Sequence, residues 1–153
     1  AGNIRVFSSG SSEAINIVAD AAVSLSHANS VKLATTSGGV TVTGAVSDSK
    51  GELRRIVQNY QTGAYVLVVG DAGKCITITT GGVTVNPSIF SSGDAVSIVN
   101  HSGSNQTITQ GSSFTLYNTA DGATGNRTLA GRGMATLFFT DNNIAYISGA
   151  GLS

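Results

Sequence analysis

The chain has 153 residues, 20 of them glycine, and only 10% are charged, with a formal net charge of zero. An ordinary soluble domain is about 25% charged. With no basic excess to hold a phosphate backbone and no apolar run of about 18 residues, the composition argues against nucleic-acid binding and against a transmembrane helix. Net charge contributes little solubility here, so we expect much of the surface to be covered by copies of the chain or by a larger assembly.

The N-terminal part is poor in large side chains. Residues 1–5 lack the basic head and apolar region of a signal peptide, and Ala1 suits removal of an initiator methionine, so we expect a complete chain without a signal peptide. The stretch 1–44 contains one aromatic residue, Phe7. Such a segment could hardly form a thick core alone. We therefore predict that residues 1–50 are a β arm for intertwining and attachment, and that residues 51–153 form a C-terminal β domain.

Apolar residues alternate with serine and threonine along most of the chain, which is the period of a β-strand. Glycine, aspartate and asparagine clusters separate these runs as turns would. Many short strands divided by turns predict an all-β protein. The alternating pairs are Val23/Leu25, Val31/Leu33, Val40/Val42, Ile76/Ile78, Val83/Val85, Val96/Ile98, Phe114/Leu116 and Leu137/Phe139.

The segment Lys50–Tyr60 gives a mixed signal. Leu53, Ile56, Val57 and Tyr60 follow the i, i+3, i+4, i+7 spacing of a helix face. A single helical turn and an irregular strand fit this segment equally well, and it is the best place for a joint between two halves. The fold expected for the whole chain is a short-stranded β domain, sandwich-like, barrel-like or fibre-like, with at most one short helix.

A short sequence occurs twice. Residues 35–42 read TTSGGVTV and residues 79–85 read TTGGVTV. A glycine pair can supply the positive φ angles of a tight reversal between strands. We therefore predict that one strand-turn-strand device is used at both places.

The alternation leaves one apolar face per strand, yet large side chains are scarce. Three copies intertwined around an axis would bury these faces together and cover exposed strand edges. This argument predicts an obligate homotrimer rather than a monomeric sandwich.

The sequence offers little chemistry. His27 and His101 are far apart and lack a carboxylate cluster, although a histidine on a trimer axis could bind an ion. The single cysteine, Cys75, is interpreted as a small buried hydrophobe. Most acidic residues lie in turn-like contexts, and Gly70–Lys74 lacks the spacing of a phosphate loop. We predict no enzymatic activity, no cofactor and no metal site.

A few residues are candidates for contacts with other subunits or with a capsid. Arginine forks pair well with carboxylates at interfaces. The candidates are Arg5, Phe7, Arg54, Arg55, Arg127 and Arg132.

Two parts of the sequence resemble modules of tailed-phage virion proteins. Residues 23–46 resemble a short β-motif of phage tail fibres. From Gly51 onward, the chain is similar to a β-domain at the C-termini of phage virion proteins. The residues that carry this second similarity are 52–55, 58–59, 65–67, 70–74, 78–85, 107–111, 124–130 and 147–152.

The resemblance implies a trimeric, fibre-like β fold on the virion surface, made in the cytoplasm of the bacterial host, with no catalytic residues. Such tail fibres usually have a long N-terminal attachment region and a shaft, whereas here the first motif begins at Val23. A short chain suits a capsid decoration (cement) protein that bridges capsomers of the major capsid protein.

Two other functions remain open. The first is a tail-fibre or receptor-binding module, bound to other tail proteins and to a host surface glycan, with Tyr60, Tyr65, Tyr117 and Tyr146 as candidate sugar contacts. The second is a polysaccharide hydrolase with two carboxylates, which the absence of tryptophan disfavours.

Overall fold

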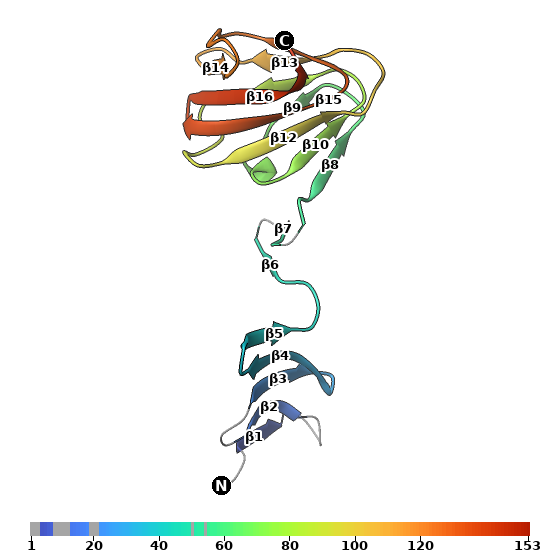
Figure 1. Ribbon diagram of the computed structural model, residues 1–153, viewed down its shortest axis with the longest axis vertical. Coiled ribbons are helices and arrows are strands. Elements are labelled where there is room, and N and C mark those ends of the chain that lie inside the picture. The colour runs from blue at the N-terminus through green and yellow to red at the C-terminus, as the bar shows by residue number, and fades with distance from the viewer. Residues whose placement is uncertain (1–3, 8–12, 19–21, 50, 54) are drawn as a thin grey trace. The chain divides into compact units, whose positions relative to one another are not determined.

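The computed structural model describes residues 4–7, 13–18, 22–49, 51–53 and 55–153, and the chain divides into two compact units, 1–48 and 49–153 (Figure 1). The boundary expected from the sequence, after residue 50, lies close to this division. Arg54 lies outside the described residues. The only helix of the described residues is a 3-10 turn, η1 (Val69–Asp71). The prediction of an all-β protein with at most one short helix is therefore confirmed.

The unit 1–48 contains one antiparallel sheet whose strands follow each other in chain order. Its strands are β1 (Ile4–Phe7), β2 (Glu13–Ile17), β3 (Val23–His27), β4 (Ser30–Thr36) and β5 (Gly39–Val42). Figure 1 shows these strands as a single layer. Two short strands, β6 (Ser47–Asp48) and β7 (Gly51–Glu52), follow in the sequence.

The unit 49–153 begins with six short strands that come in three consecutive pairs along the chain, and the members of one pair are not hydrogen-bonded to each other. The strands are β8 (Gln58–Gln61), β9 (Tyr65–Val66), β10 (Cys75–Ile78), β11 (Val83–Val85), β12 (Ala95–Asn100) and β13 (Gln106–Gln110). The first member of each pair joins one ladder, β8-β10-β12, and the second joins another, β9-β11-β13. Each pair therefore forms a corner, and the corners lie on top of one another.

Three further strands close this unit: β14 (Thr115–Asn118), β15 (Arg127–Asp141) and β16 (Ile144–Leu152). The long strand β15 runs antiparallel to β13 with its first residues and to β12 with residues 134–138. A register shift separates the two parts of β15, and Arg132 there has a φ of 66°. β15 thereby joins the two ladders into one sheet that folds over on itself, and β16 pairs with both β15 and β14.

The apolar core of the described residues lies wholly within the unit 49–153. It consists of Leu67, Ala72, Ile76, Ile78, Val83, Val85, Phe90, Val96, Ile98, Ile108, Phe114, Leu116, Leu129, Ala135, Leu137, Phe139, Ala145 and Ile147. Phe90 stacks on Phe139 with 4.3 Å between ring centroids. The expectation that sister copies must complete the interior of the whole chain is thus wrong for this unit. No described residue of 1–48 is buried, so the shortage of core is confined to that part.

Most predicted strands are found where the alternation placed them. Seven of the eight alternating pairs lie within strands, and in the eighth Phe114 immediately precedes β14 while Leu116 lies in it. In the segment 50–60, the described residues contain no helix, and β8 begins at Gln58. The helical alternative is therefore not supported there. Leu53 and Ile56 are 63% and 67% exposed and pack into no core.

The repeated sequence forms two different structures, so the prediction of one device used twice is wrong. In 35–42 the two-residue turn Ser37–Gly38 closes a hairpin, with Thr36 opposite Gly39. In 79–85 the strands β10 and β11 do not pair with each other but turn a corner into separate ladders. Gly81 and Gly82 have φ angles of 82° and 72°, and a Cβ on Gly82 would overlap the carbonyl oxygen of Thr107. The close stacking of corners explains the second glycine pair.

Candidate assembly surface

One face of the sheet in 1–48 is lined by aliphatic side chains. Residues paired across neighbouring strands lie on the same face, and so do residues two apart in one strand. The strand register therefore defines two rows that cross all five strands. The first row is Val6, Ile15, Leu25, Leu33 and Val42, and the second is Ile4, Ile17, Val23, Thr35 and Val40. We name these two rows the apolar face.

The opposite face of the same sheet is mainly polar. Its central row, set by the same register, is Arg5, Asn16, Ser24, Ala34 and Thr41. Apart from Thr35, which lies in the second row of the apolar face, the threonine and serine residues that alternate with valine and leucine thus gather on one side. The sheet is amphipathic although it has only one layer.

Within the described residues of 1–48, no second layer covers the apolar face, although Ile15, Val23, Leu33 and Thr35 are half-buried within the sheet itself. Ile4 is 62% exposed, Val40 61% and Val6 48%. An isolated exposed aliphatic residue is common, but a contiguous patch that crosses five strands is typical of an interaction surface. The apolar face is therefore the candidate functional site of this unit.

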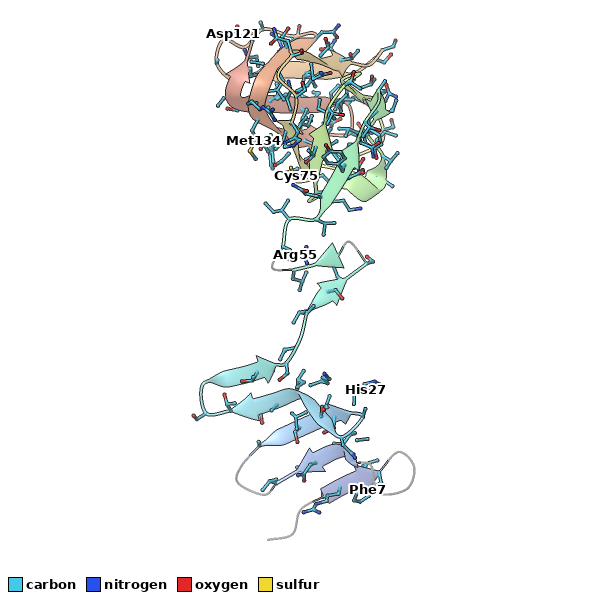
Figure 2. All side chains as sticks on the ribbon, turned by 90° about the vertical axis from the view of Figure 1, so that its right-hand side faces the viewer. Phe7, His27, Arg55, Cys75, Asp121 and Met134 are labelled. Atoms are coloured by element: carbon cyan, nitrogen blue, oxygen red, sulfur yellow. The ribbon has the colours of Figure 1, made fainter. Side chains whose placement is uncertain are left out.

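The predicted contact residues are not brought together in one place. Arg5 and Phe7 lie on β1 and are exposed; Arg5 belongs to the polar face, and Phe7 follows a register shift of the strand. Figure 2 shows Phe7 and His27 on the unit 1–48 and Arg55 on the other unit. Arg55 is exposed. In 1–48, the stronger indication of an interaction surface is the row of aliphatic residues that the strand register aligns. Candidates chosen one residue at a time do not include these residues.

Arg127 is a correction to the predicted contact set. It is 8% exposed, and its Nε and Nη2 atoms are buried without a hydrogen-bond partner. It lies opposite Ile108 in the pairing of β15 with β13, on the same side as the buried Leu129. These buried guanidinium atoms cannot reach another protein's surface.

Arg132 and His101 support a turn rather than a charged site. Arg132 Nη1 donates a hydrogen bond of 2.8 Å to the carbonyl oxygen of His101, and its backbone N–H donates to the Ser102 carbonyl oxygen at 3.1 Å. The His101 ring meets the Tyr60 ring edge-on at 6.2 Å. Within the described ranges, no three His, Cys, Asp or Glu side chains lie close enough to hold a metal ion.

A buried polar network lies at the β8 end of the parallel stack. Asp71 is 1% exposed and accepts hydrogen bonds from Asn59 Nδ2 and the Tyr65 hydroxyl, both at 2.9 Å, and from the Val68 backbone N–H at 3.0 Å. Burial, and then the hydrogen bond with Asp71, raise the pKa of Tyr65. Asn59 and Gln61 are the polar, inward-facing residues of edge strand β8. The network thus closes the core with satisfied polar groups.

This network has two consequences for the sequence predictions. The sequence around Asp71 predicts only a turn. The available signal for a buried polar network is the spacing of Asn59 and Gln61, two polar residues on one face of a strand. The Tyr65 hydroxyl donates to Asp71 inside the subunit, and its ring packs against the core, so Tyr65 has less surface to offer a sugar than the more exposed Tyr60 and Tyr146. The prediction that Cys75 is buried is confirmed, and burial raises the pKa of its thiol.

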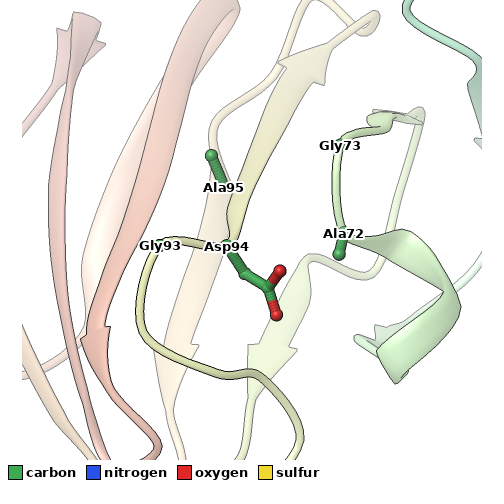
Figure 3. Close-up of a pocket in the computed structure, with 5 residues that line it drawn as sticks. All are labelled: Ala72, Gly73, Gly93, Asp94 and Ala95. Atoms are coloured by element: carbon green, nitrogen blue, oxygen red, sulfur yellow. The ribbon is translucent and has the colours of Figure 1, made fainter. Parts of the chain in front are cut away.

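A shallow pocket of about 360 Å³ is lined by Ala72, Gly73, Gly93, Asp94 and Ala95 (Figure 3). Asp94 is its only charged lining residue, and the Asp94 carboxylate accepts a 2.9 Å hydrogen bond from the Ser91 backbone N–H. The Gly73 backbone N–H donates to the Ala95 carbonyl oxygen at 2.8 Å. The pocket walls are therefore held by turn and ladder bonds, and they offer few groups for a ligand.

Comparison with known proteins adds no relative. No protein-family model matches the chain, and no curated protein matches it with significance. In the part of the chain that the structure describes, no helix is long and apolar enough to cross a membrane.

Proposed function

We propose that the protein is a homotrimeric structural component of a tailed-phage particle, and that it decorates the capsid. The observation that supports this proposal is the uncovered apolar face of a sheet that has no second layer. Exposed aliphatic surface costs free energy at about 25 cal/mol per Å², so a chain that presents such a face gains by association. The resemblance to phage virion modules supplies the setting.

The width of the apolar face favours three copies over two. Each strand contributes two residues to the face, two positions apart, so the face is only about 7 Å wide along the strands. Two such faces stacked about 10 Å apart would leave both long flanks open to water. Three narrow faces turned toward one axis close each other's flanks. No residue of the two rows is charged, which suits positions near a symmetry axis.

Trimeric assembly also serves attachment to a capsid. Three linked contacts act at high effective concentration, so individually weak contacts with the major capsid protein hold together. In this proposal, residues 1–48 form the intertwined and attaching part, and residues 49–153 project from the virion surface. Arg5 and Phe7 are exposed on β1 and remain proposed contacts of the attaching part.

Copy number tests this proposal against a tail fibre. Quantitative mass spectrometry of purified particles is expected to find hundreds of copies, whereas a few dozen or fewer would indicate a fibre. Deletion of about the first 20 residues, which include β1 and β2, is expected to abolish capsid binding. Unchanged occupancy on the particles would refute the proposed attachment.

A tail-fibre or receptor-binding function is the second candidate. One observation favours it: Tyr117 and Tyr146 stack at 5.2 Å between centroids, and Tyr146 is 42% exposed. Exposed aromatic rings are suited to sugar faces. Binding to a glycan array that is lost in a Tyr146→Ala variant would favour this function.

A further inference from the structure

The unit 49–153 has two outer surfaces of very different chemistry. On one side, the register of six strands defines three rows. They are Tyr60, Thr77, Val99, Met134 and Ala150; then Gln58, Cys75, Ser97, Thr136 and Ser148; then Ala95, Phe138, Tyr146 and Tyr117. We name these rows the neutral face, within which Thr77 and Cys75 are already buried by their neighbours. Figure 1 shows the strands β8, β10, β12, β15 and β16 side by side.

Large apolar side chains on the neutral face are exposed. Tyr60 is 53% exposed, Phe138 48%, Met134 47% and Tyr146 42%. The Met134 side chain projects from the sheet in Figure 2. The middle row consists of small or uncharged polar side chains, and Ser97 and Thr136 satisfy each other with a 3.2 Å hydrogen bond between hydroxyls. The neutral face thus has a middle row of small or polar side chains between two rows that carry large exposed ones.

The other outer surface, over β11, β13 and the start of β15, is rich in threonine. Thr84 is paired with Thr109, and Thr107 with Thr128. Val66, which is 48% exposed, lies opposite Thr84 at the β9 side of this surface. Threonine suits a pleated surface that stays wet. The unit therefore has one surface that is mainly threonine and one that carries several large exposed apolar side chains.

Charged residues surround the neutral face but do not enter it. Lys74 and Asp94 immediately precede β10 and β12, Asp141 ends β15, and Arg132 lies at the register shift of β15. A neutral, aromatic centre with a charged rim is the usual anatomy of a protein–protein interface. Absence of charge in the centre also fits a position near a symmetry axis, where any charge would approach the same charge on another copy.

We infer that the neutral face packs against the neutral faces of other copies of this chain, as a second trimer interface. This inference rests on the proposed trimer: copies joined through residues 1–48 would hold the units 49–153 at high effective concentration, so a modest apolar face suffices to pair them. The face then orders the units 49–153 around an axis, while their threonine-rich surfaces face solvent.

Met134 provides a direct test because it is the single methionine of the chain. Hydrogen peroxide converts methionine to its sulfoxide, which intact-mass spectrometry detects. In the native full chain, Met134 is expected to oxidise about tenfold or more slower than a free methionine derivative, since tenfold corresponds to about 1.4 kcal/mol of protection. Sedimentation of the same sample reports its oligomeric state.

A second measurement uses cysteine cross-linking in a Cys75→Ser background. Thr136→Cys places a thiol in the middle of the neutral face, and Thr107→Cys places one on the threonine-rich surface; both threonines are exposed. A short bis-maleimide is expected to link copies through position 136 and not through position 107.

The outcomes separate the two proposals. A trimer with protected Met134 and cross-linking at position 136 supports the second interface. A trimer whose Met134 reacts as fast as the free derivative and whose position 136 does not cross-link overturns this inference and leaves the proposed function standing, with the face open to a different partner. A chain that sediments as a monomer overturns both.

Discussion

The two units of this chain use the same alternation of apolar and polar residues but reach different ends. In 49–153, the sheet folds over on itself and buries Phe90, Phe114 and Phe139 between its layers. In 1–48, the alternation produces a single amphipathic layer in which no described residue is buried. The difference teaches that alternation specifies a face, whereas a closed core also needs a second layer and bulky side chains to fill the space between.

The largest effect is expected from charge on the apolar face of 1–48. Leu25→Asp would place a carboxylate of every copy in the shared interior, which costs several kcal/mol for each buried charge. We expect association to weaken by about a thousandfold or more. Sedimentation equilibrium over a range of concentrations measures this change.

Ser24→Asp is the matched control, because Ser24 precedes Leu25 in β3 and lies on the polar face. This variant is expected to assemble like the unchanged chain. Equal dissociation of both variants would show that β3 itself is damaged and that the apolar face is not the reason.

A cavity in the closed core comes next. Phe139→Ala removes a fully buried ring that stacks on Phe90, and we expect a loss of about 3–5 kcal/mol in the free energy of unfolding. Because this core is complete within one copy, the loss should be the same at every protein concentration. Chemical denaturation of the 49–153 transition measures it.

The adjacent Phe138 sharpens the same comparison, since it is 48% exposed on the neutral face. Phe138→Ala is expected to weaken contacts between copies and to leave the core intact. If Phe138→Ala lowered the unfolding free energy as much as Phe139→Ala at high dilution, the assignment of the two sheet faces would be wrong.

The two glycine pairs offer an intermediate effect. Gly82→Ala is expected to cost about 2–4 kcal/mol, because alanine at a φ of 72° is strained and its Cβ would overlap the Thr107 carbonyl oxygen. Gly39 has a φ of 132°, but its Cβ would meet nothing within 4 Å, so Gly39→Ala is expected to cost only about 1–2 kcal/mol of strain. Thermal unfolding of the two variants gives the order.

The smallest effect is expected in the polar network. Tyr65→Phe removes the hydroxyl that donates to Asp71, at a cost of about 1 kcal/mol near neutral pH. The pKa of Tyr65 is raised from 10.0, so the unfolded chain releases this proton at lower pH than the folded chain. The contribution of Tyr65 to stability is therefore constant below about pH 10 and falls as the pH rises toward the raised value.

Denaturation curves at several alkaline pH values check this prediction. The unchanged chain is expected to lose stability more steeply above pH 10 than the Tyr65→Phe variant. If the free energy of unfolding of the two proteins fell with pH at the same rate, Tyr65 would not contribute the expected pH dependence.

Much of the local structure could be predicted from the sequence. Pairs such as Val96/Ile98 mark strands because one strand face is buried and the other is not. The sequence could not tell that β10 and β11 join different ladders, since that choice depends on partners distant in the chain. The repeat of Gly-Gly-Val-Thr-Val misled for this reason: two glycines allow a reversal but do not decide between a hairpin and a corner.

The candidate surfaces were harder to predict than the strands. The apolar face can be recognised only when Val6, Ile15 and Leu25 are aligned by the strand register. The sequence alone does not specify that register. Arg127 illustrates the opposite error, because a charged strand residue is expected to be exposed, whereas Arg127 is only 8% exposed. Composition did indicate where core is scarce, since Phe7 is the only aromatic residue before Gly44.

Native mass spectrometry of the full chain at low micromolar concentration tests the central claim most directly. Because no second layer within the described residues of 1–48 covers their apolar face, we expect one dominant species with the mass of three chains. A stable species with the mass of one chain would contradict this expectation if hydrogen exchange shows that its sheet of 1–48 is folded.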